Sequence, residues 1–236
     1  MKTPPAKPLY PMRINKYLAL KKYCTRREAD TMIEKGKVLI NGKRAVLGDQ
    51  VRETDTVDVK FRQKKYRYFA YFKPRGIITH SPQGDEQDIA MVTPIEGVFP
   101  IGRLDKDSYG LIILTDDGRI TETMLNPKYE HEKEYEVSCL DELPKYFKER
   151  MEAGVNIGDY TTKPCSVTII GKKKFSIILK EGKRHQIRRM CGAFGQSATE
   201  LKRVRVMNIR LGALRSGEHR AIEGGELQVF LKALGV

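Results

Sequence analysis

Several residue types and patterns are absent or scarce in this 236-residue chain. It has no tryptophan, and its four cysteines, Cys24, Cys139, Cys165 and Cys191, are scattered without a Cys-x-x-Cys pair. This spacing argues against a zinc finger and against a disulfide-stapled secreted fold, and it favours a reducing cytoplasm. No apolar run approaches the roughly 20 residues needed to cross a bilayer. Prolines interrupt the N-terminal segment before a signal-peptide core could form.

The chain also lacks a balance of charge. Lys and Arg number 44 against 30 Asp and Glu, a formal net charge of +14. This excess is more than solubility requires and favours a polyanionic partner, with nucleic acid ahead of an anionic membrane. The four histidines show no metal-ligand spacing, and "HEKEY" has Tyr135 where a zinc helix would carry its second histidine. We therefore expect no metal site.

Local signals in the first sixty residues predict a small module of two helices and a strand unit. Apolar positions from Met12 onward fall at helical spacing. Thr25 and Glu28 form the pattern of a capping box for a second helix. Asn41-Gly42 predicts a type I′ turn between two extended runs.

This module resembles the S4 RNA-binding domain. The resemblance is carried by "RINKYLALKKYCTRREADTMIEKGKVLINGKRA", with its Arg-rich signature and its V-x-I-N-G-K hairpin. It implies contacts that position RNA rather than read its sequence. The basic residues expected to make these contacts are Arg13, Lys16, Arg26, Arg27, Lys37 and Lys43. The expected organisation is a flexible tail over 1–11, an S4 domain over 12–61, a linker over 62–67 and a catalytic domain over 68–236.

The stretch "PIGRLDKDSYGLIILTDDG", residues 100–118, concentrates acids beside glycines and an apolar run. A turn explains some of them, since Asp and Gly both favour turns. The spacing also approaches a calcium loop, but Tyr109 stands at a ligand position and Asp116 where a glutamate is usual. Neither explains why Arg103 and Asp105 share a strand-like face. If the segment enters an interior, Asp105 needs a cationic partner to stay ionised.

The same stretch resembles the catalytic motif of pseudouridine synthases, in the branch with an N-terminal S4 module that includes the RsuA, RluB, RluE and RluF types. The RluF type, which modifies 23S ribosomal RNA, is the most similar. Three further motifs match the family: "YFKPRGIITHS" at 71–81, "HEKEYEV" at 131–137 and "EGKRHQIRRMCGAFG" at 181–195.

The resemblance implies isomerisation of uridine to pseudouridine in ribosomal RNA without a cofactor. It implies that Asp105 is the catalytic aspartate, that Arg188 is its cationic partner and that Tyr135 stacks on the uracil. Leu201 corresponds to an apolar pocket residue, and Arg103 occupies the vacated base position or holds a phosphate. The residues expected to extend the phosphate track are Lys73, Arg184 and Arg189. Arg184 and Arg188 are expected on one face of a helix.

For the larger domain the pattern predicts an α+β fold with a mostly antiparallel sheet. Strands are expected at 68–72, 111–115, 135–139, 175–179 and 227–231, and helices near 144–153 and 186–194. The expected partner is ribosomal RNA or a ribosome assembly intermediate, bound by a monomer. A catalytically silent RNA-binding factor, or the same activity on small-subunit or transfer RNA, are the alternatives. The sequence leaves open whether Asp105 attacks the sugar or abstracts a proton.

Overall fold

The computed structural model describes residues 9–60 and 65–236, which divide into two compact units, one within residues 1–65 and one comprising Tyr66–Val236. Residues 1–8 of the predicted tail and residues 62–64 of the predicted linker lie outside the described residues. Within the described ranges, no helix combines the length and apolar composition needed to span a bilayer.

The smaller unit is built from two helices and short strands. Its elements are β1 (Met12–Arg13), α1 (Ile14–Leu20), α2 (Arg26–Glu34), β2 (Val38–Ile40), β3 (Lys43–Arg44), β4 (Gln50–Val51) and β5 (Val57–Val59). The strands form a sheet of order β3-β2-β5 and a separate β1-β4 pair, all antiparallel. Apolar side chains of both helices pack with β2 and β4 into one core.

The local predictions for this unit are confirmed. The Thr25 hydroxyl accepts the Glu28 backbone N–H at 3.2 Å, and the Glu28 carboxylate accepts the Thr25 N–H at 2.8 Å, which completes the capping box of α2. Asn41 and Gly42 have φ values of 50° and 77° between β2 and β3. Both values belong to the left-handed region that a type I′ turn requires.

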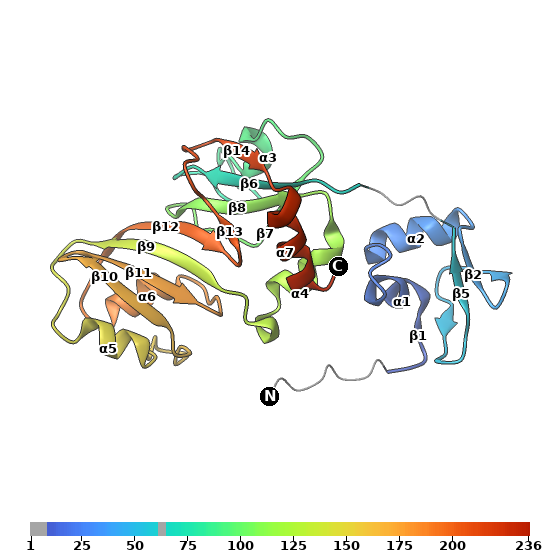
Figure 1. Cartoon of the computed structure of the whole chain (residues 1–236), viewed down its shortest axis with the longest axis horizontal. Coiled ribbons are helices and arrows are strands. Elements are labelled where there is room, and N and C mark those ends of the chain that lie inside the picture. Colours follow the sequence, from blue (N-terminus) through green and yellow to red (C-terminus); the bar gives the residue numbers. More distant parts are fainter. Residues whose placement is uncertain (1–8, 61–64) are drawn as a thin grey trace. The chain divides into compact units, whose positions relative to one another are not determined.

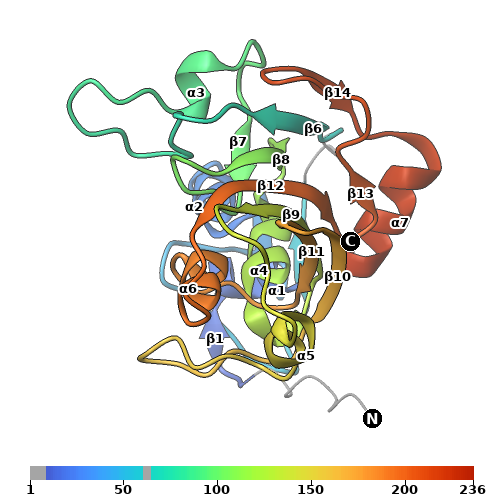
Figure 2. The same cartoon turned by 90° about the vertical axis from the view of Figure 1, so that its left-hand side faces the viewer.

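The larger unit contains one extended, curved sheet flanked by helices (Figures 1 and 2). Its strands are β6 (Tyr68–Lys73), β7 (Phe99–Ile101), β8 (Tyr109–Thr115), β9 (Lys133–Cys139), β10 (Ser166–Gly171), β11 (Lys174–Leu179), β12 (Ala198–Val206), β13 (Ile209–Arg210) and β14 (His219–Ala221). Its helices are α3 (Ile89–Val92), α4 (Thr121–Leu125), α5 (Phe147–Glu152), α6 (Gln186–Gly192) and α7 (Gly224–Leu234), with 3-10 turns at Gly118–Ile120 and Pro127–Tyr129.

The strand order is β10-β11-β9-β12-β8-β6-β14, with β13 beside β12 and β7 beside β8. Every pairing is antiparallel except that of β12 with β8, which is parallel. The predicted α+β class with a mostly antiparallel sheet is therefore confirmed.

The predicted strand at 227–231 is wrong, because these residues lie inside helix α7. Leu227, Phe230, Leu231 and Leu234 recur at the i, i+3, i+4, i+7 spacing of a helix. Phe230 and Leu234 are buried, and the other two pack against the same core. The apolar run was too short to separate a strand from one stripe of a helix.

Besides a smaller apolar cluster around Tyr71 and Ile112, two larger cores lie along the large sheet. In one, α5 and α6 pack on strands β9 to β12, as Figure 1 shows below that part of the sheet. In the other, α4 and α7 pack with β6, β7 and β8. Strand β12 contributes to both cores, with Leu201 in the first and Val206 in the second.

Candidate active site

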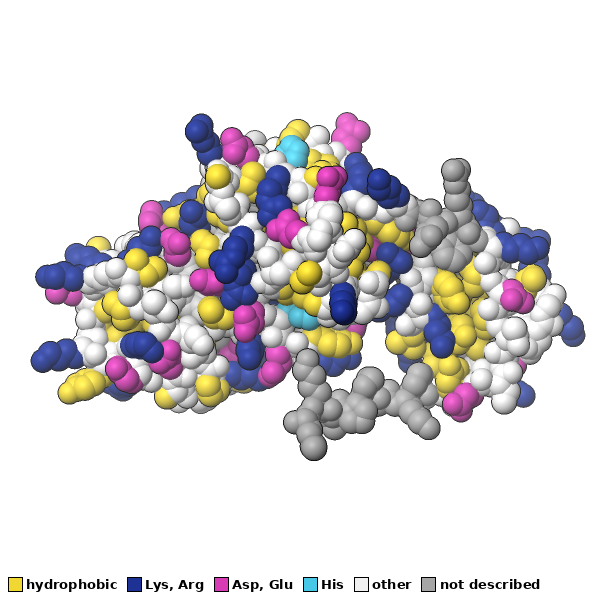
Figure 3. Space-filling model, in the orientation of Figure 1, with side chains coloured by type: hydrophobic (Ala, Val, Ile, Leu, Met, Phe, Trp, Pro, Cys, Tyr) yellow, Lys and Arg dark blue, Asp and Glu magenta, His cyan; other side chains and the backbone are white. Residues whose placement is uncertain are grey.

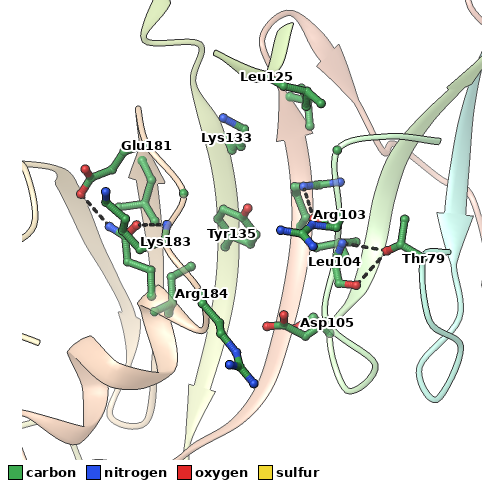
Figure 4. A pocket seen from close by; sticks show the side chains of 18 of the residues that line it. Thr79, Arg103, Leu104, Asp105, Leu125, Lys133, Tyr135, Glu181, Lys183 and Arg184 are labelled. Atoms are coloured by element: carbon green, nitrogen blue, oxygen red, sulfur yellow. Dashed lines mark hydrogen bonds between the residues drawn. The ribbon is translucent and has the colours of Figure 1, made fainter. Parts of the chain in front are cut away.

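A pocket of about 730 Å³ opens between these two cores. Six segments form its wall: 78–80, 100–106 with Ser108, 124–127, then His131, Lys133 and Tyr135, then 179–187, and finally Leu201, Arg203 and Val206. Figure 4 shows Asp105 and Arg103 on the loop between β7 and β8, facing Tyr135 on β9, with Arg184 on the loop before α6. Six separate segments of the chain therefore meet around one cavity, whose size is that of an ordinary small-ligand site.

The Asp105 loop is fixed by its backbone. The Thr79 hydroxyl donates to the Leu104 carbonyl at 2.8 Å and accepts the Leu104 N–H at 3.0 Å. The Ser108 N–H donates to the Asp105 carbonyl at 3.0 Å, which closes the turn predicted from its Asp and Gly content. At Gly110, where the loop enters β8, φ is +101° and a Cβ would lie 2.4 Å from the Arg203 carbonyl. Only glycine allows β12 to approach this closely.

Lys73 lies behind this loop and is completely buried, so the prediction that it binds RNA phosphates is wrong. Its ammonium donates to the Ser108 and Pro74 carbonyls at 2.8 and 2.9 Å, with the Lys106 carbonyl at 3.4 Å. Burial lowers the pKa of Lys73 to about 8, although the nearby Asp105 charge acts in the opposite direction. Lys73 is therefore a buried cation that fastens the loop.

A second buried cation holds the other side of the same loop. The Arg203 side chain, with only 4% of the residue exposed, donates through Nε to the Leu111 carbonyl at 2.6 Å and through Nη1 to the Arg103 carbonyl at 3.3 Å. Lys73 and Arg203 thus both bind backbone carbonyls of the segment that carries Asp105.

The Asp105 carboxylate itself is not deeply buried, since 39% of its side chain is exposed. The premise that it enters a closed interior is therefore incorrect. Its ion-pair partner within the described residues is His185, whose Nδ1 lies 3.3 Å from Oδ2. His185 has a φ of 51° at the N-cap of α6, a conformation uncommon for a residue with a side chain.

The expected pair between Arg188 and Asp105 is absent among the ion pairs of the described residues. The Arg188 guanidinium instead donates through Nη1 to the Ala198 carbonyl at 2.7 Å, while Nη2 is buried without a hydrogen-bond partner there. Helix α6 begins only at Gln186. Arg184 therefore precedes the helix, and the expected shared helical face of Arg184 and Arg188 does not form.

Arg184 and Arg189 also lie in different surroundings. Arg184 is exposed and lines the pocket near Asp105 (Figure 4). Arg189 is turned away from the pocket, because its guanidinium binds the Ile157 carbonyl and the Asp159 carboxylate. The expected place of Arg189 in a phosphate track is therefore wrong.

Glu181 and Gln186 fix the loop that presents Arg184 and His185. The buried Glu181 carboxylate accepts the Lys163 N–H at 2.9 Å, the Tyr160 hydroxyl at 2.8 Å and the Gln186 amide at 2.8 Å. The Gln186 side chain in turn accepts the Lys183 N–H at 2.9 Å. This network was not predicted, since nothing in the local sequence shows that an acid before a glycine is buried.

Two further residues singled out from the sequence, Tyr135 and Leu201, belong to the pocket wall. Both line the pocket, on the adjacent strands β9 and β12, and Tyr135 is the direct register partner of Arg203. Lys133 lies two residues before Tyr135 and therefore on the same face of β9. The pocket wall also contains three residues that were not predicted to line it, Lys133, His185 and Glu181, although all three lie within the motifs that match the family.

Basic side chains are also exposed on the smaller unit. All six residues expected to contact RNA there are exposed: Arg13, Lys16, Arg26, Arg27, Lys37 and Lys43. Figure 3 shows Lys and Arg spread among acidic side chains over the visible face of both units. In the described part of the chain, no group of three His, Cys, Asp or Glu side chains could hold a metal ion.

Known proteins resemble both units. Residues 67–193 match a family model described as RNA pseudouridylate synthase, and residues 12–57 match the S4 domain. The chain is 42% identical over 229 residues to the dual-specificity RNA pseudouridine synthase RluF of Salmonella typhi, a match that covers 94% of this chain and 79% of that protein. It is 33% identical over 231 residues to the ribosomal large subunit pseudouridine synthase B of Bacillus subtilis, covering 92% and 94%.

A crystal structure of a pseudouridylate synthase also superimposes on the chain. The TM-score is 0.68 with 26% sequence identity, and the match covers 94% of this chain and 99% of that one.

Proposed function

Because the chain belongs to the RNA pseudouridylate synthase family, we propose that it isomerises a specific uridine to pseudouridine in 23S ribosomal RNA, with Asp105 as the catalytic residue. The observation that carries this proposal is the pocket itself. It brings Asp105, Tyr135 and Leu201 together with several cations in a space that suits one extruded nucleotide.

The reaction moves the uracil from one attachment to another on the same sugar. The bond between N1 and C1′ breaks, and a bond between C5 and C1′ forms. The proton on C5 is lost and N1 gains one, so the reaction is redox-neutral and we expect it to need no cofactor. The partly exposed Asp105 carboxylate can either attack C1′ or remove a proton from the neighbouring sugar carbon.

The surrounding residues supply binding and orientation. We assign the Tyr135 ring to stacking on the uracil and Leu201 to its apolar contact, because both line the pocket. Arg103 and Arg184 are exposed at the pocket and can contact phosphates of the RNA backbone. We assign residues 12–61 to RNA docking and 68–236 to catalysis, acting as a monomer in the cytoplasm, where ribosomal RNA is found.

The decisive test uses purified protein, unmodified ribosomal RNA and no added cofactor. We expect pseudouridine from the wild-type chain, and none from Asp105→Asn, which keeps the shape of the side chain but removes its charge. Both proteins should bind the RNA equally. Asp107→Asn is the matched control, because Asp107 is exposed and outside the pocket wall. Equal product from wild type and Asp105→Asn would refute the role of Asp105. No product from either would favour an RNA-binding factor without activity.

The RNA target is identified in cells. Pseudouridines mapped in 23S, 16S and transfer RNA, from cells with and without this gene, should differ at a position in 23S RNA. A site lost only from 16S or transfer RNA would overturn the substrate assignment while leaving the chemistry intact.

A further inference from the structure

Two cations of the pocket wall have no acidic partner. Lys133 donates from Nζ to the His131 carbonyl at 3.2 Å, and Arg203 donates only to the Leu111 and Arg103 carbonyls. Over residues 9–60 and 65–236, neither forms an ion pair. Each cation therefore keeps unused donor capacity at the pocket.

The acids of the pocket wall are already occupied. Asp105 pairs with His185, and the Glu181 carboxylate accepts three hydrogen bonds from its own side of the pocket. Burial and the neighbouring Arg203 charge lower the pKa of Lys133. Two like charges held close together in a partly dry site are costly unless an anion joins them.

The position of the pair relative to Tyr135 suits the substrate. Lys133 and Tyr135 project from the same face of β9, about 7 Å apart along the strand, and Arg203 lies beside Tyr135 in register on β12. Figure 4 shows Lys133 and Tyr135 one after the other along β9. A group bound between Lys133 and Arg203 would thus lie next to a base stacked on Tyr135.

We propose that Lys133 and Arg203 form a phosphate subsite that holds the phosphodiester adjacent to the extruded uridine. This inference rests on the proposed function, since it takes RNA as the ligand. A phosphodiester is the anionic group that every RNA linkage provides, and it accepts hydrogen bonds from an ammonium and a guanidinium at once. The subsite anchors the backbone while the base turns during the reaction.

The test pairs a protein variant with a change in the RNA. The probe is a synthetic stem-loop that contains the mapped uridine, with one uncharged methylphosphonate at its 5′ or its 3′ linkage. Binding is measured on an Asp105→Asn background, so that the result does not depend on turnover. We expect Lys133→Met to weaken binding by about 10- to 100-fold. A methylphosphonate at one of the two linkages should weaken binding to the Lys133-containing protein similarly.

Lys133→Met combined with the methylphosphonate at the responsive linkage should then lower the RNA affinity little more than either change alone. Lys133→Arg should restore most of the affinity, and thermal unfolding should show that each variant is folded. Lys172→Met is the matched control, since Lys172 is 81% exposed on the turn between β10 and β11 and pairs with Glu142. Its effect should be small and should multiply with that of the methylphosphonate.

Two results would overturn the subsite. One is that Lys133→Met leaves RNA binding unchanged. The other is that the affinity losses from Lys133→Met and from the methylphosphonate multiply, whether the methylphosphonate stands at the 5′ or at the 3′ linkage. Either result leaves the proposed function in place, because that function is tested by product formation with the wild-type chain. Conversely, failure of the activity assay leaves the binding measurements interpretable, because they do not depend on turnover.

Discussion

Replacing Lys73 by Met tests whether a buried cation fastens the Asp105 loop. The substitution keeps a similar volume but leaves the carbonyls of Pro74 and Ser108 without their donor. An unpaired buried carbonyl costs about 1–3 kcal/mol, so the two short bonds together represent about 2–6 kcal/mol. The variant also removes a penalty. The fall in the pKa of Lys73 from 10.5 to about 8 means that burying its charge costs about 3 kcal/mol.

At pH 7 the loss of the two hydrogen bonds and the removal of the buried charge oppose each other, so we expect a modest loss of stability there. Only the cost of the buried charge changes with pH. Between pH 8 and 10.5 the unfolded chain still binds the proton that folded Lys73 has released, so wild-type stability rises with pH. Linkage gives about 2 kcal/mol more stability at pH 9.5 than at pH 7. Lys73→Met has no such group and should not show this gain.

The assay is urea unfolding of the larger unit at pH 7 and pH 9.5, with the wild-type and variant chains measured side by side. Other titrating groups cancel in the difference. We expect the stability gap to widen by about 2 kcal/mol at the higher pH. For Lys172→Met, on an exposed turn, the difference in stability from wild type should be the same at pH 7 and pH 9.5. A Lys73→Met gap that is equal at both pH values would refute the buried-charge reasoning. Turnover should fall because the Asp105 loop loses its anchor.

Two further predictions concern the same loop and its neighbour. Gly110→Ala should lower the free energy of unfolding by about 2–4 kcal/mol, because the new Cβ would meet the Arg203 carbonyl at a left-handed φ; unchanged urea unfolding would contradict this. His185→Asn should keep most of the single-turnover rate, because Asn tolerates the same φ and can donate to Asp105. His185→Gly tolerates the φ but loses the contact, and should be about tenfold slower; equal rates for the two variants would show that the contact is not used.

The sequence alone determined the local elements and the family motifs. The capping box of Thr25 and Glu28 and the turn at Asn41-Gly42 involve hydrogen bonds and φ values set within four residues, so neighbouring letters are enough to predict them. The 100–118 stretch likewise pointed to Asp105 through its motif. It was the motif that placed Tyr135 and Leu201 near it, since their spacing alone favoured an ordinary strand and core.

Only the tertiary structure decided which cations serve that carboxylate. Lys73, at the end of β6, is buried and donates to the Ser108 carbonyl, and Arg188 on α6 donates to the Ala198 carbonyl. Whether a basic side chain faces a pocket, a carbonyl or solvent depends on packing between segments that here lie 10 to 100 residues apart. A positive charge looks the same in each of these places when only its sequence neighbours are known.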